Sequence, residues 1–182
     1  MDKYVLLQEE AVLLIIDMQE KLLPAMKYGK QIIRNTNTII SFAKRLEVPI
    51  IFTEQYPKGL GKTTSEVSDN LGELSPCEKS TFSSCTPEVT SVLKGLGRKK
   101  IILTGTETHV CVFQTARGLL DLGYQVFVVG DATCSRTKEN YRNGLALMSS
   151  MGAVVTNTET VLFDLLKESG TPLFKELSKL IK

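Results

Sequence analysis

Ala11-Val-Leu-Leu-Ile-Ile-Asp17 is the stretch of sequence that decides the fold, because six apolar residues are followed at once by a carboxylate. A short, uninterrupted apolar run is typical of a parallel strand that helices cover on both faces. Further runs of this kind, rich in β-branched residues, predict strands over residues 48–53, 100–104, 125–129 and 153–156. We therefore expect a parallel sheet in which the first run is a buried strand.

Amphipathic stretches separate these runs. Apolar residues at helical spacing predict helices over residues 29–46, 87–96, 110–122 and 138–151. A glycine follows each of the last three, at Gly97, Gly123 and Gly152, where a helix commonly ends. Residues 159–182 read as two short helices separated by Gly170-Thr-Pro172. Alternating strands and helices indicate an α/β protein built from right-handed βαβ units.

The segment 55–86 does not fit this alternation. It shows no clear period and contains three glycines and several polar residues. A compact domain rarely carries so much irregular chain without a function, so we expect the segment to line a site. No repeat or linker interrupts the rest, and residues 1–182 are interpreted as a single domain.

Composition excludes several classes of protein. Of the 182 residues, 42% are apolar and 23% are charged, which is typical of a globular protein, and the net charge of +2 indicates no nucleic-acid or membrane partner. No apolar run approaches the ~18 residues that a membrane span needs. The run at residues 11–16 is too short for a secretory signal, and the four cysteines are interpreted as reduced thiols. We expect a cytoplasmic location, with a mitochondrial one left open.

Ligands of an open parallel sheet bind beyond the carboxyl ends of its strands. Asp17 follows the first apolar run, and Cys111 begins the helix predicted after the run at residues 100–104. We expect the helix N-terminus to lower the pKa of the Cys111 thiol and favour a nucleophilic thiolate. The alternatives are an Asp17 that only ends a strand or caps a turn, and a Cys111 that is a small buried apolar residue.

The sequence gives little support for other catalytic mechanisms or for a nucleotide or zinc site. His109 is the only histidine and lies two positions before Cys111, so on one helix the two side chains would point about 200° apart and form a poor dyad. The chain contains no G-x-S-x-G, no P-loop motif and no glycine-rich turn after the first run. Cys77 and Cys85 lack a second pair of zinc ligands. A nucleophilic Cys111 therefore requires a carboxylate, which Asp17 can supply, and a cation that composition does not select among 22 basic residues.

Three motifs carry a resemblance to a known family. The strings Ile15-Ile-Asp-Met-Gln19, Glu78-Lys-Ser-Thr-Phe-Ser83 and Gly105-Thr-Glu-Thr-His-Val-Cys-Val112 resemble the isochorismatase-like cysteine hydrolases in order and spacing. The resemblance covers nearly the whole chain. Thr53-Glu-Gln-Tyr-Pro-Lys-Gly-Leu-Gly61 is similar to the subgroup called isochorismatase domain-containing proteins.

The resemblance implies a Rossmann-like three-layer fold with a six-stranded parallel sheet. It also implies a catalytic triad of Asp17, Lys79 and Cys111, in which Asp17 takes the thiol proton and Cys111 forms a thioester. Backbone N–H groups of Cys111 and of the preceding turn would hold the oxyanion. In the family that turn carries a cis peptide bond, here expected between Thr106 and Glu107.

Differences between this sequence and two branches of the family that it resembles narrow the expected activity. Metal-dependent nicotinamidases use one Asp and two His as ligands, so a chain with one histidine is expected to need no metal or other cofactor. True isochorismatases lack the cysteine. We therefore expect a metal-independent hydrolase of a small amide or carbamoyl-type C–N bond, with a small-molecule substrate and a homo-oligomeric state.

Five further residues are candidates for the substrate pocket, namely Gln19, Gln55, Tyr56, Phe82 and His109. A polar turn after the second apolar run explains Gln55 and Tyr56 equally well.

The competing functional hypothesis is a non-catalytic or thiol-sensing oligomeric binding protein that retains the hydrolase fold.

Overall fold

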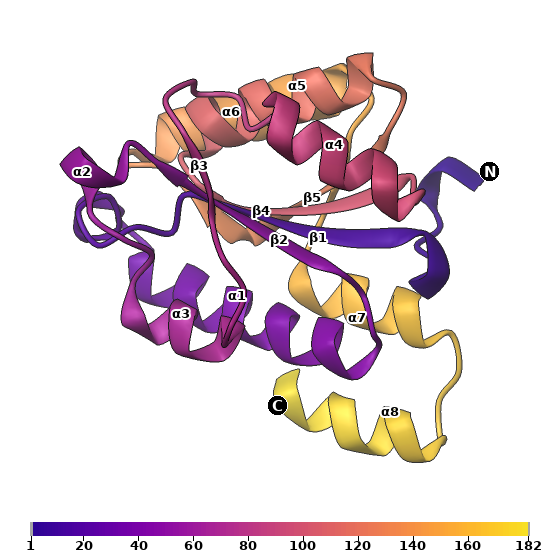
Figure 1. Ribbon diagram of the computed structural model, residues 1–182. Coiled ribbons are helices and arrows are strands. Elements are labelled where there is room, and N and C mark those ends of the chain that lie inside the picture. The colour runs from indigo at the N-terminus through magenta and orange to yellow at the C-terminus, as the bar shows by residue number, and fades with distance from the viewer. Residues whose placement is uncertain (1, 182) are drawn as a thin grey trace.

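The computed structural model describes residues 2–181 and has three layers, with a parallel sheet between two layers of helices (Figure 1). The strand order is β3-β2-β1-β4-β5-β6, and every neighbouring pair is parallel. This confirms the α/β fold and the six-stranded parallel sheet. The strands are β1 (Ala11–Ile16), β2 (Ile50–Gln55), β3 (Cys77–Lys79), β4 (Lys100–Thr106), β5 (Gln125–Cys134) and β6 (Val154–Thr156).

Helices cover both faces of the sheet (Figure 1). One face carries α1 (Gly29–Arg45), α3 (Ser65–Leu71), α7 (Thr158–Leu166) and α8 (Pro172–Leu177). The opposite face carries α4 (Pro87–Leu96), α5 (Phe113–Asp121) and α6 (Lys138–Ser150). The short α2 (Pro57–Leu60) follows β2. Single-turn 3-10 helices occupy Asp2–Tyr4, Gln8–Glu10, Leu23–Ala25 and Ser178–Ile181.

The core explains why β1 is apolar throughout. All six of its side chains are buried. Ala11, Leu13 and Ile15 belong to the cluster packed under α1 and α7, whereas Val12, Leu14 and Ile16 belong to the cluster packed under α4 and α5. Successive side chains of a strand point to opposite faces, so a strand covered on both sides needs an apolar residue at every position.

Several helices begin at a side-chain cap. In each case the side chain of the residue before the helix accepts a hydrogen bond from a backbone N–H in the first turn, which satisfies one of the donors that a helix leaves unpaired. Such caps explain why the helix starts at Pro87 and Lys138 coincide with those predicted. The capping residues are Thr86, Thr137, Asn157 and Thr171.

The segment 55–86 is more ordered than the sequence indicated. It contains α2, α3 and the edge strand β3. Because β3 is only three residues long and buries a lysine, Lys79, beside a single apolar residue, Cys77, it lacks the apolar period that reveals a strand. The expected irregular segment is therefore corrected to two helices and a strand. The strand predicted at residues 48–53 lies two residues further on, at Ile50–Gln55.

Gly105 brings the ends of β4 and β1 together. The register between β4 and β5 shifts between Leu103 and Gly105, and Gly105 has a φ of +114°. A Cβ atom at this position would lie 2.0 Å from the carbonyl oxygen of Ile16. Only glycine permits this approach, which places the end of β4 against the last residue of β1.

Candidate active site

Asp17, Lys79 and Cys111 come from three separate elements at the carboxyl edge of the sheet. Asp17 follows β1, Lys79 ends β3, and Cys111 lies between β4 and α5. All three are buried, with exposed fractions of 0%, 6% and 7%. The carboxyl edge of an open parallel sheet is where such folds bind ligands.

The Asp17 carboxylate is held from two sides. Its Oδ2 lies 2.7 Å from the Nζ of Lys79, and its Oδ1 accepts a 2.7 Å hydrogen bond from the hydroxyl of Thr53. The backbone of Asp17 is in the left-handed region at φ +48°, and the hydroxyl of Thr106 donates to its carbonyl over 2.7 Å. These contacts fix the carboxylate in one orientation.

Oxygen atoms of the protein surround the ammonium group of the buried Lys79. Its Nζ lies 2.7 Å from Asp17 Oδ2 and 2.7 Å from Gln55 Oε1, and 3.2 Å from each of the carbonyl oxygens of Thr81 and Phe82. A lysine ammonium has three protons, so four oxygen acceptors leave none free. These contacts offset the desolvation of a buried cation, and they make Lys79 a fixed positive charge beside Asp17.

Cys111 lies in a π-helical turn, Thr108–Val112, that precedes α5. Burial raises the pKa of the Cys111 thiol to about 12; the charge of Asp17 and a hydrogen bond to it also raise this pKa, whereas Lys79 and a backbone hydrogen bond with Glu107 lower it. The expected lowering of this pKa by a helix N-terminus is therefore wrong. Burial and an adjacent carboxylate outweigh the turn's dipole, so the resting group is a thiol next to Asp17.

The turn before Cys111 has a cis peptide bond between Thr106 and Glu107. The carbonyl of Glu107 accepts from the N–H groups of Val110 and Val112 over 3.0 and 3.2 Å. The Glu107 side chain lies 3.0 Å from the Nε of Arg136 at the surface. The regular helix predicted to start at residue 110 begins instead with the π turn, and α5 ends at Asp121.

The side-chain amides of the two glutamines predicted to line the pocket form hydrogen bonds within the protein. Gln19 is fully buried; its Oε1 accepts from the backbone N–H of Gln55 over 2.7 Å, and its Nε2 donates to the carbonyls of Gln55 and Gly61 over 3.0 and 2.6 Å. Gln55 uses its Oε1 for Lys79 and its Nε2 for the carbonyl of Ser80. Both amides therefore hold the ends of β1, β2 and β3 together.

The other three predicted pocket residues are partly or largely exposed. Tyr56 and Phe82 have exposed fractions of 58% and 55%. Both contact Lys79 through their backbones, because the Tyr56 N–H donates to the Lys79 carbonyl and the Phe82 carbonyl accepts from the Lys79 ammonium. His109 is half-buried, and its Nδ1 lies 3.0 Å from the hydroxyl of Ser135.

Sequence reasoning missed a set of buried hydroxyl groups behind the carboxylate. Thr53 lies 2.7 Å from Asp17, the hydroxyl of Ser84 lies 3.4 Å from that of Thr53, and the backbone N–H of Ser84 donates to the hydroxyl of Thr115 over 2.9 Å. Thr53 ends the second apolar run, which was the only signal for it. Ser84 and Thr115 carried no signal because their contacts are long-range.

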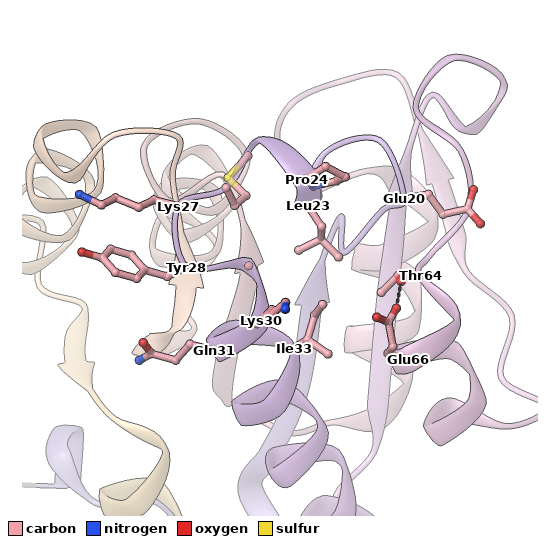
Figure 2. Close-up of a pocket in the computed structure, with 12 residues that line it drawn as sticks. Glu20, Leu23, Pro24, Lys27, Tyr28, Lys30, Gln31, Ile33, Thr64 and Glu66 are labelled. Carbon is pink, nitrogen blue, oxygen red and sulfur yellow. Dashed lines mark hydrogen bonds between the residues drawn. The ribbon is translucent and has the colours of Figure 1, made fainter.

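A separate cavity of about 670 Å³ lies between residues 20–33 and residues 64–66. Figure 2 shows apolar Leu23 and Ile33 among charged side chains, with Glu66 hydrogen-bonded to Thr64. None of the three candidate catalytic residues lines this cavity. Within residues 2–181 no group of three His, Cys, Asp or Glu side chains is placed to hold a metal ion.

Comparison with known proteins agrees with this fold. Residues 11–160 match the isochorismatase domain. The chain is 41% identical to the secreted isochorismatase effector Isc1 of Phytophthora sojae over 97% of this chain and 87% of that protein. It is 39% identical to isochorismatase domain-containing protein 2 of Xenopus laevis, over 96% of this chain and 84% of that one.

Solved structures show the same architecture. The MAR1 ribonuclease of Caenorhabditis elegans superposes with a TM-score of 0.92 at 38% identity, covering 97% of this chain and 92% of that one. The YcaC gene product of Escherichia coli, described as an octameric hydrolase of unknown specificity, superposes with a TM-score of 0.90 at 22% identity over 97% and 90% of the two chains.

The fold and the edge-of-sheet site define an α/β protein of the hydrolase type. The chain belongs to the isochorismatase domain family. No helix within the described part of the chain is long and apolar enough to cross a membrane.

Proposed function

We propose that this protein is a cysteine hydrolase that cleaves a small amide or carbamoyl-type C–N bond through a thioester on Cys111, without a metal ion. The observation that carries the proposal is the buried pair of Asp17 and Lys79, 2.7 Å apart, directly beside the Cys111 thiol. A thiol with a raised pKa reacts only when a base removes its proton, and Asp17 is that base.

The reaction has two balanced halves. In the first, Cys111 Sγ bonds to the carbonyl carbon while its proton passes to Asp17; the C–N bond then breaks, and the amine leaves with that proton. In the second, Asp17 takes a proton from water, hydroxide adds to the thioester carbonyl, and the C–S bond breaks to return the thiol and release the acid. Lys79 stabilises the Asp17 carboxylate as a fixed charge. Backbone N–H groups of Cys111 and the preceding cis turn would hold the oxyanion.

The proposal also covers the class of substrate, the extent of the domain, the oligomeric state and the location. We place the substrate among small molecules, because the three proposed catalytic residues are buried and a large substrate would have to bring its reacting bond below the surface. We also propose one domain over residues 1–182, a homo-oligomer and a cytoplasmic location. The octameric description of the YcaC gene product supports the oligomer, and one sizing-column run tests it.

The test is a panel of small primary amides, ureas and carbamates incubated with the protein, with release of ammonia or amine as the readout. An RNA oligonucleotide belongs in the panel because the Caenorhabditis elegans neighbour is described as a ribonuclease. The control variants are Cys111→Ala and Cys85→Ala, since Cys85 is a half-buried thiol of raised pKa with no carboxylate bonded to it. Turnover is expected to survive Cys85→Ala and to disappear in Cys111→Ala.

Trapping the intermediate separates this proposal from its rival. Mass spectrometry of a quenched reaction is expected to show an acyl group on the peptide that contains Cys111. Turnover that persists in Cys111→Ala would disprove the cysteine mechanism. A Cys111 that takes up oxidants but acylates with no member of the panel would favour the alternative, a thiol-sensing binding protein.

A further inference from the structure

β2 runs between the strands that supply the base and the cation, and its side chains reach both. Register places Ile16, just before Asp17, opposite Thr53, and places Lys79 opposite Gln55. Thr53 and Gln55 are two residues apart and therefore lie on the same side of the strand. Gln55 bonds the Lys79 ammonium, and Thr53 bonds the carboxylate of Asp17.

Thr53 belongs to a buried chain of hydroxyl groups that reaches the helix of the nucleophile. Its hydroxyl donates to Asp17 Oδ1 over 2.7 Å and lies 3.4 Å from the hydroxyl of Ser84. The backbone N–H of Ser84 donates to Thr115, which lies one helical turn after Cys111. Thr53, Ser84, Thr115 and Asp17 have exposed fractions of at most 1%. This path connects Asp17 to the segment after Lys79 and to α5.

The two oxygens of Asp17 are held differently. Oδ2 bonds a cation that has no free proton, and Oδ1 bonds Thr53. A carboxylate oxygen has two lone-pair sites, so each oxygen keeps one site for a further proton. Without the bond to Thr53, Lys79 alone would hold the carboxylate, which could then rotate about its bond to Cβ and turn its remaining sites away from the thiol.

We infer that Thr53 is a positioning residue of the proposed hydrolase: its hydroxyl orients the Asp17 carboxylate toward the Cys111 thiol. The inference rests on the proposed function, because it assigns Asp17 as the base. It identifies Thr53 as acting through Asp17 and not by contact with substrate.

The test needs no knowledge of the substrate, because iodoacetamide reports proton removal from Cys111. Sγ displaces iodide from the reagent, and the thiol proton passes to Asp17. Peptide mass spectrometry follows alkylation of Cys111 and Cys85 in the same sample across pH 4–9. In wild type the Cys111 rate is expected to reach a plateau, because a fixed base and not solvent hydroxide removes the thiol proton, whereas the Cys85 rate is expected to rise tenfold per pH unit.

Thr53→Val keeps the shape of the side chain and removes the donor. We expect the Cys111 plateau to fall by about tenfold to a hundredfold, because misplacing a catalytic group costs factors of this size. Thr53→Ser restores the donor and should recover the wild-type plateau.

A matched control comes from another buried strand threonine. Thr104 in β4 has no exposed surface, and its hydroxyl has no hydrogen-bond partner within residues 2–181. Thr104→Val is therefore expected to leave the Cys111 profile unchanged. If Thr53→Val does not fold, Thr53→Ala provides a second removal of the hydroxyl, and thermal unfolding shows which variants retain the native structure.

The contacts of the charged groups determine which of them the pH profile of Cys111 reports. Lys79 from β3 and Cys111 from the π turn contact Asp17 directly. Two other acidic groups have partners of their own, because Glu107 is paired with Arg136 and Glu54 accepts a hydrogen bond from Thr63. A folded Thr53→Val with the wild-type plateau would overturn the positioning role and leave the proposed function intact. A wild-type Cys111 that shows no plateau, and reacts as it does in Asp17→Asn, would overturn the proposed function itself.

Discussion

Gly144 of α6 lies directly against the turn that carries the nucleophile. A Cβ atom at this position would lie 2.9 Å from the Cα of His109, 2.9 Å from the carbonyl oxygen of Thr108 and 3.0 Å from the nitrogen of His109. All three are backbone atoms of the π turn and cannot rotate away. Gly144→Ala is therefore expected to push α6 and the Cys111 turn apart.

The magnitude follows from these distances. Ordinary contacts between carbon atoms lie at about 3.5–4.0 Å, so the two segments would have to separate by roughly half an ångström or more. Overpacking of this kind costs about 1–3 kcal/mol. Replacing glycine by alanine inside a helix returns about 1 kcal/mol. We expect a net loss of about 1 kcal/mol and slower alkylation of Cys111.

The matched control is Gly95→Ala in α4. Gly95 also lies inside a helix, and a Cβ atom there would meet nothing within 4 Å. It therefore gains helix stability of about 1 kcal/mol without a clash. The two variants should differ by about 2 kcal/mol, which corresponds to roughly 4–8 °C in Tm for a chain of this size. Differential scanning calorimetry measures this difference, and iodoacetamide labelling measures the reactivity of Cys111.

The result that would refute the reasoning is equally definite. If Gly144→Ala is as stable as Gly95→Ala and labels Cys111 at the wild-type rate, the π turn does not depend on close packing of α6. Lower stability with unchanged labelling would show that α6 supports the fold without setting the position of the nucleophile.

Two further predictions concern the thiol and the strand end. Because the pKa of Cys111 is raised to about 12, its contribution to stability is fully present below the unfolded-state pKa of about 8.5 and is lost as pH rises toward 12. Because burial also raises the pKa of Cys77, Cys85 and Cys134, the Cys111 contribution is measured as a difference between two proteins. Urea unfolding between pH 9 and 11 should show that the wild type loses stability more steeply than Cys111→Ser, by up to about 1.4 kcal/mol per pH unit, and equal slopes in the two proteins would contradict the buried neutral thiol. Gly105→Ala places a Cβ 2.0 Å from the Ile16 carbonyl and should prevent native folding, whereas Gly123→Ala, at φ +81° with no atom within 4 Å, should cost only about 1–2 kcal/mol. Circular dichroism compares the two, and a native Gly105→Ala would show that β1 and β4 can separate.

Sequence patterns predicted five of the six strands and gave no signal for the edge strand β3. The five apolar runs all became strands, because burial on both faces requires local sequence to be apolar at every position. The resemblance implied a sixth strand without placing it, and Cys77-Glu78-Lys79 has no apolar period. The helix over residues 110–122 was predicted as regular, but a π turn takes the place of its start, and the packing of this turn against Gly144 of α6 joins parts of the chain that are distant in sequence.

The opening run, residues 11–17, shows what the sequence by itself determined. Its apolar residues predict a strand buried on both faces, and its terminal carboxylate marks the end of the strand where a site is expected. The tertiary structure decided that Lys79, one of 22 basic residues and 62 positions away along the chain, holds this carboxylate. It also decided that Cys111 rests as a thiol. The physical reason is that apolar periodicity is a local property of the chain, whereas desolvation and charge interactions depend on atoms that only the folded chain brings together.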